Sequence, residues 1–110
     1  MNGCSLRFYL HENQKVHGRL LYEWLLDEAR AQGIHGGSAF RAISGFGRHG
    51  VLQEQHFFEL AGAQTVLVEF IVEDAQADAL LSHVRNSGAP MFFARFPAHF
   101  GVLGEERGSA

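Results

Sequence analysis

Residues 65–72, Thr-Val-Leu-Val-Glu-Phe-Ile-Val, constrain the fold more than any other part of the chain. The run is rich in β-branched residues and almost wholly apolar, so we expect a strand that is covered on both faces. The chain's own helices can cover one face. Because 110 residues are too few to supply a third layer, the other face calls for a second subunit. The sequence leaves open which set faces the helices: Val66, Val68 and Phe70, or Leu67 and Ile71.

Alternating patterns and turn residues predict the other strands. Leu6, Phe8 and Leu10 alternate with more polar neighbours, which indicates a half-buried first strand. A glycine pair opens the next strand, and Pro97 is expected to stop the last one because proline cannot donate to a sheet ladder. In chain order these strands cover residues 5–10, 38–44, 57–60 and 91–96, of which 57–60 is a short extra strand before the third main strand at 65–72.

Two helices are expected between the strands. In residues 19–32 four apolar side chains share one helical face before Gly33 stops the helix: Leu21, Trp24, Leu25 and Ala29. Asp74 is a suitable N-cap for the second helix, which ends at Gly88 and whose apolar stripe is Ala77, Leu80, Leu81 and Val84. The βαββαβ order predicts an α+β fold, the ferredoxin-like sandwich, with both helices on one face of an antiparallel four-stranded sheet. We expect one domain over residues 1–103 and a frayed tail over residues 104–110.

The composition narrows the classes of function. The formal net charge of −3 at pH 7 argues against nucleic-acid binding, which needs a basic surface. Ten Phe are more than one small domain easily buries, so some are expected in a subunit interface. Cys4 is the one cysteine, which leaves no internal disulfide and favours a reducing compartment. We see no signal peptide and no apolar stretch of the roughly 18 residues that span a membrane, so we expect a cytoplasmic protein without membrane insertion.

Residues 41–50 carry the most distinctive motif, in which an apolar strand runs into glycines around an aromatic, an arginine and a histidine. Glycines on both sides of Phe46 can expose adjacent backbone N–H groups to an anion. Arg48 can add a bidentate contact, and His49 can add a hydrogen bond or, when protonated, a charge. The predicted ligand site, suited to phosphate or carboxylate, comprises Arg41, Gly45, Phe46, Gly47, Arg48 and His49. A tight turn without a ligand is the alternative interpretation of the same glycines.

Other candidate chemistry is less developed in the sequence. Arg7, Arg41 and Glu69 lie in expected strands, where ion pairing within the sheet or across an interface is favoured. No familiar motif of an enzyme class is present, so we expect no enzyme and no bound cofactor. An apolar substrate pocket lined by Phe57-Phe58 and Phe92-Phe93 is the enzymatic alternative, although such pairs more often form core or interface.

Seven histidines raise the question of a metal site: His11, His17, His35, His49, His56, His83 and His99. None of them has a helical His-x-x-x-His spacing or a matching cysteine set, so no metal ligands are predicted. A symmetric trimer that gathers three copies of one histidine keeps the metal hypothesis open. Because the unperturbed pKa of histidine is near 6.5, assembly that depends on pH is a related expectation.

Four stretches together carry a family resemblance: residues 3–10, 18–23, 29–37 and 40–47, with the run from Tyr22 to Gly47 the most specific. In them the chain resembles the small bacterial and archaeal family catalogued as domain of unknown function 190, which is related to the PII signalling proteins. The resemblance implies a ferredoxin-like fold, a homotrimer and non-enzymatic sensing of a ligand in clefts between subunits. It places Gly45, Phe46, Gly47 and Arg48 at the base of the loop that helps to form such a cleft.

The chain also departs from true PII proteins. It lacks the long insert and the modifiable tyrosine after the second strand, and it lacks the basic, glycine-containing run that binds phosphate. Binding of ATP and 2-oxoglutarate is therefore not implied. The leading hypothesis is a trimeric sensor that binds a small anionic metabolite or a nucleotide and signals to a protein partner such as a transporter or channel. The alternatives are a metal-binding trimer of the copper-tolerance type and a small cofactor-free enzyme.

Overall fold

A computed structural model describes residues 1–46 and 64–104. The helices are α1 (Leu21–Ala31) and α3 (Asp74–Ser87). The strands are β1 (Asn2–His11), β2 (Lys15–Val16), β3 (Arg19–Leu20), β4 (Ser38–Arg41), β5 (Thr65–Val72) and β6 (Phe92–His99). The short strand expected at residues 57–60 lies outside the described residues, as does the tail from residue 105 onward.

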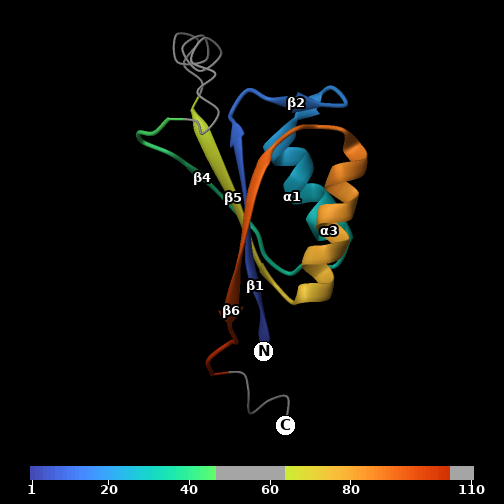
Figure 1. Cartoon of the computed structure of the whole chain (residues 1–110), viewed down its shortest axis with the longest axis vertical. Helices are drawn as coiled ribbons and strands as arrows, with labels where there is room; N and C mark the ends of the chain where they lie inside the picture. Colours follow the sequence, from blue (N-terminus) through green and yellow to red (C-terminus); the bar gives the residue numbers. More distant parts are fainter. Residues whose placement is uncertain (47–63, 105–110) are drawn as a thin grey trace.

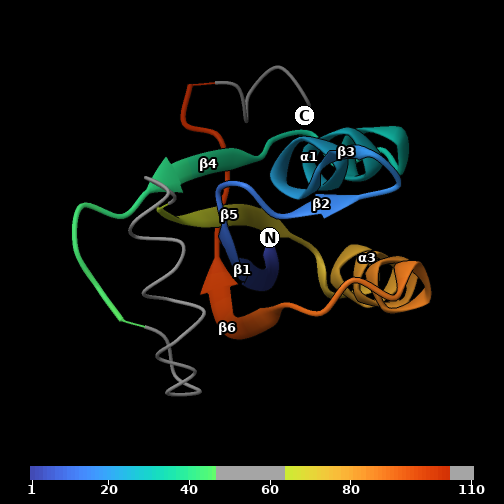
Figure 2. The same ribbon diagram turned by 90° about the horizontal axis from the view of Figure 1, so that it is seen from above.

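Within the described residues the main sheet has four strands in the order β4-β5-β1-β6, and every neighbouring pair is antiparallel. Both helices lie on one side of this sheet, as Figures 1 and 2 show from two directions. Together with the strand order along the chain, this arrangement is the ferredoxin-like α+β fold that the sequence predicted. The opposite side of the sheet carries no helix of the described residues.

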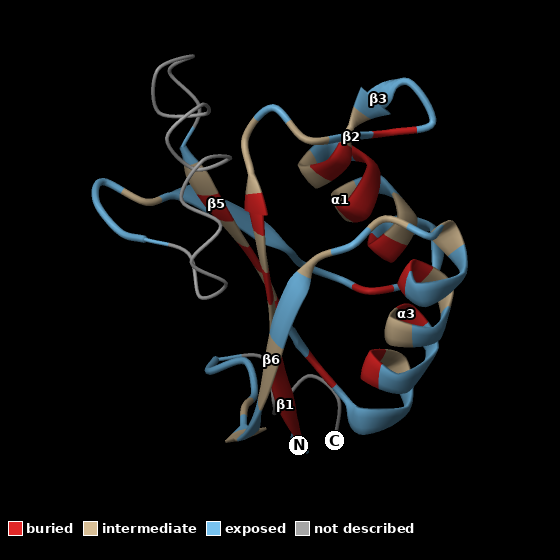
Figure 3. Ribbon diagram, turned by 45° about the horizontal axis from the view of Figure 1, so that its top comes forward, coloured by how far each residue is buried: buried red, intermediate tan, exposed pale blue. Residues whose placement is uncertain are grey.

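The hydrophobic core lies between the sheet and the helices. Alternate residues of β5 point into it, because Val66, Val68, Phe70 and Val72 are each at most 5% exposed. From β1 the core receives Leu6 and Phe8, and the ring of Phe8 meets that of Phe70 edge-on, with centroids 6.2 Å apart. Figure 3 shows the buried residues where helices and sheet face each other. The question that the sequence left open is thus settled: Leu67 and Ile71 lie on the side away from the helices.

Helix α1 buries the four side chains that its periodicity predicted, Leu21, Trp24, Leu25 and Ala29. Gly33 follows with a positive φ of 86°, and its N–H donates to the carbonyl of Arg30, which confirms the predicted stop. The expected start at residue 19 was wrong. Residues 19 and 20 form β3, which pairs with β2 across a two-residue turn at His17 and Gly18, both with positive φ. Helix α1 therefore begins only at Leu21.

Other expected boundaries were also wrong: β1 begins at Asn2 rather than residue 5 because it pairs with β6 from there, and three more differ for reasons of strand pairing or capping. Strand β4 ends at Arg41 instead of Ser44, because its partner β5 begins at Thr65 and the Ala42 N–H donates the last bond, to the Thr65 carbonyl. Strand β6 continues through Pro97 to His99. It is an edge strand, paired on one side only, where a missing N–H costs no ladder bond if it faces outward.

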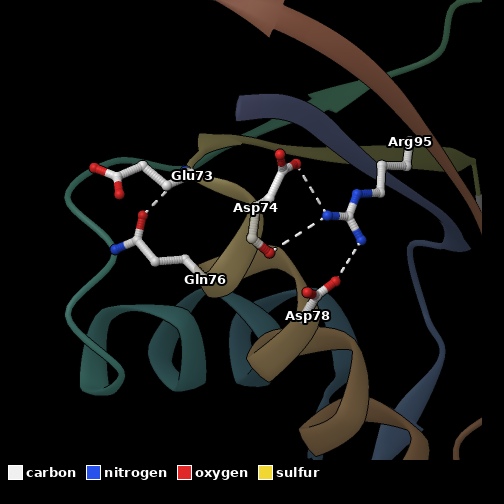
Figure 4. Close-up of polar contacts among 5 residues, drawn as sticks. All are labelled: Glu73, Asp74, Gln76, Asp78 and Arg95. Atoms are coloured by element: carbon white, nitrogen blue, oxygen red, sulfur yellow. Dashed lines mark hydrogen bonds and ion pairs between the residues drawn. The ribbon is translucent and has the colours of Figure 1, made fainter. Parts of the chain in front are cut away.

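The third correction concerns the start of α3. Its N-cap is Glu73 rather than Asp74, and the Glu73 N–H donates to the side-chain oxygen of Gln76 at 3.2 Å (Figure 4). Asp74 occupies the first position of the helix instead. The end of α3 follows the sequence prediction, since Gly88 adopts the left-handed conformation there with φ 79°.

Candidate functional site

The side of the sheet that faces away from the helices exposes a group of large apolar side chains. Phe40, Ile71, Phe92 and Phe96 are between 43% and 51% exposed, and they come from three strands, β4, β5 and β6. Strand register places them on the same face as three polar side chains of the two central strands. We call this surface the open face and define it by Ser5, Arg7, Tyr9, Phe40, Leu67, Glu69, Ile71, Phe92 and Phe96.

A polar cluster lies at the centre of the open face. The same carboxylate oxygen of Glu69 accepts hydrogen bonds from Arg7 Nε and from Ser5 Oγ, both at 3.0 Å. The guanidinium carbon of Arg7 lies 5.2 Å from the centroid of the Phe96 ring, a cation–π contact. Hydrogen bonds to Glu69 and then to Tyr9 raise the pKa of Arg7, which stays charged. The sequence predicted ion pairing of Arg7 and Glu69 within the sheet or across an interface, and the structure pairs them with each other within the sheet.

The predicted ligand loop follows the edge strand β4. At its base, Arg41 donates from Nε to Glu12 at 3.2 Å and forms a second contact from its terminal nitrogen. The hydrogen bond from Arg41 lowers the pKa of the Glu12 carboxyl, and Arg41's own pKa is raised in return. Glu12 is held in place because its backbone N–H donates to the Gln64 carbonyl at 2.7 Å. Arg41 therefore has a satisfied ion pair, and its charge is balanced.

Beyond Arg41 the structure describes the loop as far as Phe46. Phe46 is 94% exposed, and Ile43 before it is fully exposed. Gly45 has no positive φ, and a Cβ built on it would meet none of the described residues within 4 Å, so this part of the structure does not require glycine there. The remaining members of the predicted site, Gly47, Arg48 and His49, lie outside the described residues.

A third polar group joins the other edge strand to a helix. Arg95 of β6 donates to Asp78 at 2.7 Å and to Asp74 at 3.0 Å, both in α3, as Figure 4 shows. These hydrogen bonds, first the one to Asp78, raise the pKa of Arg95. The nearby thiol of Cys4 is buried, and burial raises its pKa although Arg95 acts in the opposite sense. The cluster fixes β6 against α3 and leaves Cys4 an unreactive core residue.

Two of the histidines take part in an aromatic cluster between the helices. The ring of His83 stacks on Trp24 with centroids 5.8 Å apart, and its Nε2 contacts a Glu28 carboxylate oxygen. The ring of His17 meets that of Trp24 edge-on, with centroids 6.2 Å apart. Within residues 1–46 and 64–104, no group of three or more His, Cys, Asp or Glu side chains lies close enough to share a metal ion.

The open face is the feature that sequence reasoning described only in part. The apolar β5 run and the excess of Phe predicted an uncovered surface. The contribution of β4 was missed, and that of β6 was anticipated only in that Phe92-Phe93 was assigned to core or interface. Their signal was present, because Phe92 and Phe96 are separated by an even number of positions in a strand and so share a face. Which face they share depends on the register of β6 with β1, which the sequence does not contain.

Among the described residues, no helix is both long and apolar enough to cross a membrane.

Comparison with known proteins finds a match to the family model described as "Uncharacterized ACR, COG1993", over residues 3–89. A UPF0166 protein of Aquifex aeolicus (strain VF5) is 30% identical over 81 residues, which cover 74% of this chain and 77% of the relative. A UPF0166 protein of Methanocaldococcus jannaschii is 32% identical over 87 residues, covering 76% and 80% respectively.

Proposed function

The chain belongs to this uncharacterised family, the domain of unknown function 190, and from that premise we propose that it is a non-enzymatic, PII-like sensor that works as a homotrimer. Three copies bury their open faces against one another. A small anionic metabolite or nucleotide binds between subunits at the loop after β4. Binding changes the contacts that the trimer makes with a protein partner such as a transporter or channel. The lone cysteine fits a cytoplasmic setting, where disulfides are rare.

The open face is the observation that carries this proposal. Its exposed aromatic and aliphatic side chains come from three of the four strands, β4, β5 and β6, and contiguous apolar surface of that kind ordinarily marks an interface. Aromatic residues are also enriched where subunits meet. Covering the face with a second copy removes this surface from water without a further layer in the chain.

The position of the loop supports a ligand site at the edge of that interface. Strand β4 is an outer strand of the sheet, so the loop that follows it leaves the subunit at its margin (Figure 1). Phe46 is almost fully exposed there and can stack on a base or pack against a neighbouring subunit. The Arg41–Glu12 pair fixes the base of the loop, which leaves Arg48 as the unassigned cation of the motif.

A ligand screen tests the proposal. Adenine nucleotides, cyclic dinucleotides and carboxylate metabolites are added singly, and the melting temperature of the wild type is compared with that of Arg48→Ala and of Arg30→Ala. Arg30 is an exposed arginine in the last turn of α1 and serves as the matched control. One anion class should stabilise the wild type and Arg30→Ala equally.

Arg48→Ala should bind that ligand more weakly. Loss of a charge-assisted contact costs roughly 1.5–3 kcal/mol, which corresponds to about ten- to a hundred-fold in affinity. Equal affinity in Arg48→Ala would remove the anion site from this loop. If no anion binds, the sensor proposal fails, and a copper or zinc ion retained in native mass spectrometry would support the metal-binding alternative.

A further inference from the structure

The open face is organised in rows that follow from strand register. The middle row reads Ser38, Glu69, Arg7 and Ala94 across β4, β5, β1 and β6. On one side lies a bulky row of Phe40, Leu67, Tyr9 and Phe92. On the other side lie Ile71, Ser5 and Phe96. A charged pair flanked by two small residues therefore crosses the face between the bulky row and a row whose large side chains are Ile71 and Phe96.

The charges of the middle row point to a second copy of the chain as the occupant of the open face. Arg7 and Glu69 stand directly opposite each other on the two central strands and cancel, so the row has no net charge. A nucleic acid or an anionic membrane would need an excess of positive charge on this surface. An identical face offers instead the same apolar area, and around a three-fold axis the Arg7 of one copy can meet the Glu69 of the next.

The pair also selects among possible arrangements of subunits, because covering its two charges with apolar groups costs free energy. Glu69 accepts two hydrogen bonds and Arg7 has one further polar neighbour in Tyr9, but their side chains remain 24% and 37% exposed and so keep contact with water. An arrangement of subunits that sets the pair against a bulky apolar row removes that water without replacing its hydrogen bonds. An arrangement in which the middle rows of two subunits meet replaces the lost hydrogen bonds to water with hydrogen bonds between the subunits.

We propose that the Arg7–Glu69 pair specifies the assembly: opposite charges of the middle rows meet across each subunit contact, and this contact fixes one register and one number of chains. The apolar rows supply most of the attraction, and the charged row excludes the alternatives. A single polar position in an apolar interface sets register and oligomer state in the same way in coiled coils. This inference rests on the proposed homotrimer but concerns residues that the ligand site does not use.

Replacement of the pair by apolar residues tests the inference. Arg7→Met combined with Glu69→Leu keeps the size of both side chains and removes both charges, so neither is left unpaired. The matched control is Arg19→Met with Asp27→Leu, which removes an exposed ion pair on the helical side of the molecule. Native mass spectrometry should show a single stoichiometry for the wild type and the control, and at least two coexisting stoichiometries for the Arg7/Glu69 variant. A single stoichiometry equal to that of the wild type would overturn the inference.

A charge exchange gives a second readout if the apolar variant does not fold. Arg7→Glu combined with Glu69→Arg keeps the pair within the chain and reverses its direction. Unfolded together and refolded with the wild type, these chains should sort into two separate homo-oligomers, because mixed contacts would bring like charges together. Statistical mixing of the two chains would overturn the inference. A monomeric wild type would instead overturn the proposed assembly itself, so the two failures are distinguishable.

Discussion

Two adjacent glycines before β4 give a sharp test of how this edge strand packs. A Cβ added to Gly37 would lie 2.7 Å from Cδ1 of Phe70 and closer still to Cε1 of the same ring, and 3.1 Å from Cδ2 of Leu26. Phe70 is 1% exposed and is held against Phe8, so its ring cannot turn aside freely. A Cβ added to Gly36, in contrast, would meet nothing within 4 Å.

The two Gly→Ala substitutions should therefore change the free energy of unfolding in opposite directions. Overpacking of this kind costs about 1–3 kcal/mol in the free energy of unfolding. At about 4–8 °C per kcal/mol for a small domain, Gly37→Ala should melt roughly 5–20 °C below the wild type. Gly36→Ala loses only conformational freedom of the unfolded chain, which is worth about 0.4–1 kcal/mol in favour of the folded state.

Thermal unfolding followed by far-UV circular dichroism measures both variants side by side. We expect a clear loss for Gly37→Ala and a melting temperature at or slightly above that of the wild type for Gly36→Ala. Equal melting temperatures for the two variants would show that the chain at Gly37 does not lie against Phe70 as described. The described position of β4, and of the loop that follows it, would then be wrong as well.

Two further predictions concern pH and metal. Because Arg41 lowers the pKa of Glu12 below its ordinary 4.5, the pair stabilises the fold above that value and loses its contribution as the pH falls through the lower, folded value. The free energy of unfolding in urea should thus drop more for the wild type than for Glu12→Gln between about pH 6 and about pH 3, whereas the exposed Glu23→Gln should behave as the wild type does; equal drops in all three would contradict the pairing. A chelator should leave the melting temperature unchanged, and a fall of more than about 5 °C, on the order of 1 kcal/mol for a domain of this size, would favour a structural metal.

The sequence predicted the elements whose pattern repeats along the chain. The apolar face of α1, the alternation of β1 and the strand at residues 65–72 all rest on periods of 3.6 or 2, and each was confirmed. The β2–β3 hairpin was missed because strands of two residues contain no period. Its turn had one signal, Gly18, which a loop explains equally well.

Other features depend on which strands become neighbours, and that information is not local. Pro97 stops a central strand but not an edge strand, so its effect follows from the order β4-β5-β1-β6. The orientation of β5 was undecidable because both of its faces are apolar. The partner of Arg41 is Glu12, which lies 29 positions away, before the β2–β3 hairpin and α1. For the ligand site, Arg41 can be placed in detail, whereas the roles of Gly47, Arg48 and His49 stay predictions.

The mass of the wild type in solution tests the central claim most directly. The open face should be covered by sister subunits at micromolar concentration, because its exposed Phe and Ile side chains have no layer over them among the described residues. Sedimentation equilibrium should then give three times the 12.2 kDa of one chain, without dependence on concentration in that range. A stable monomer of 12.2 kDa would contradict the account, since it would leave the open face in water.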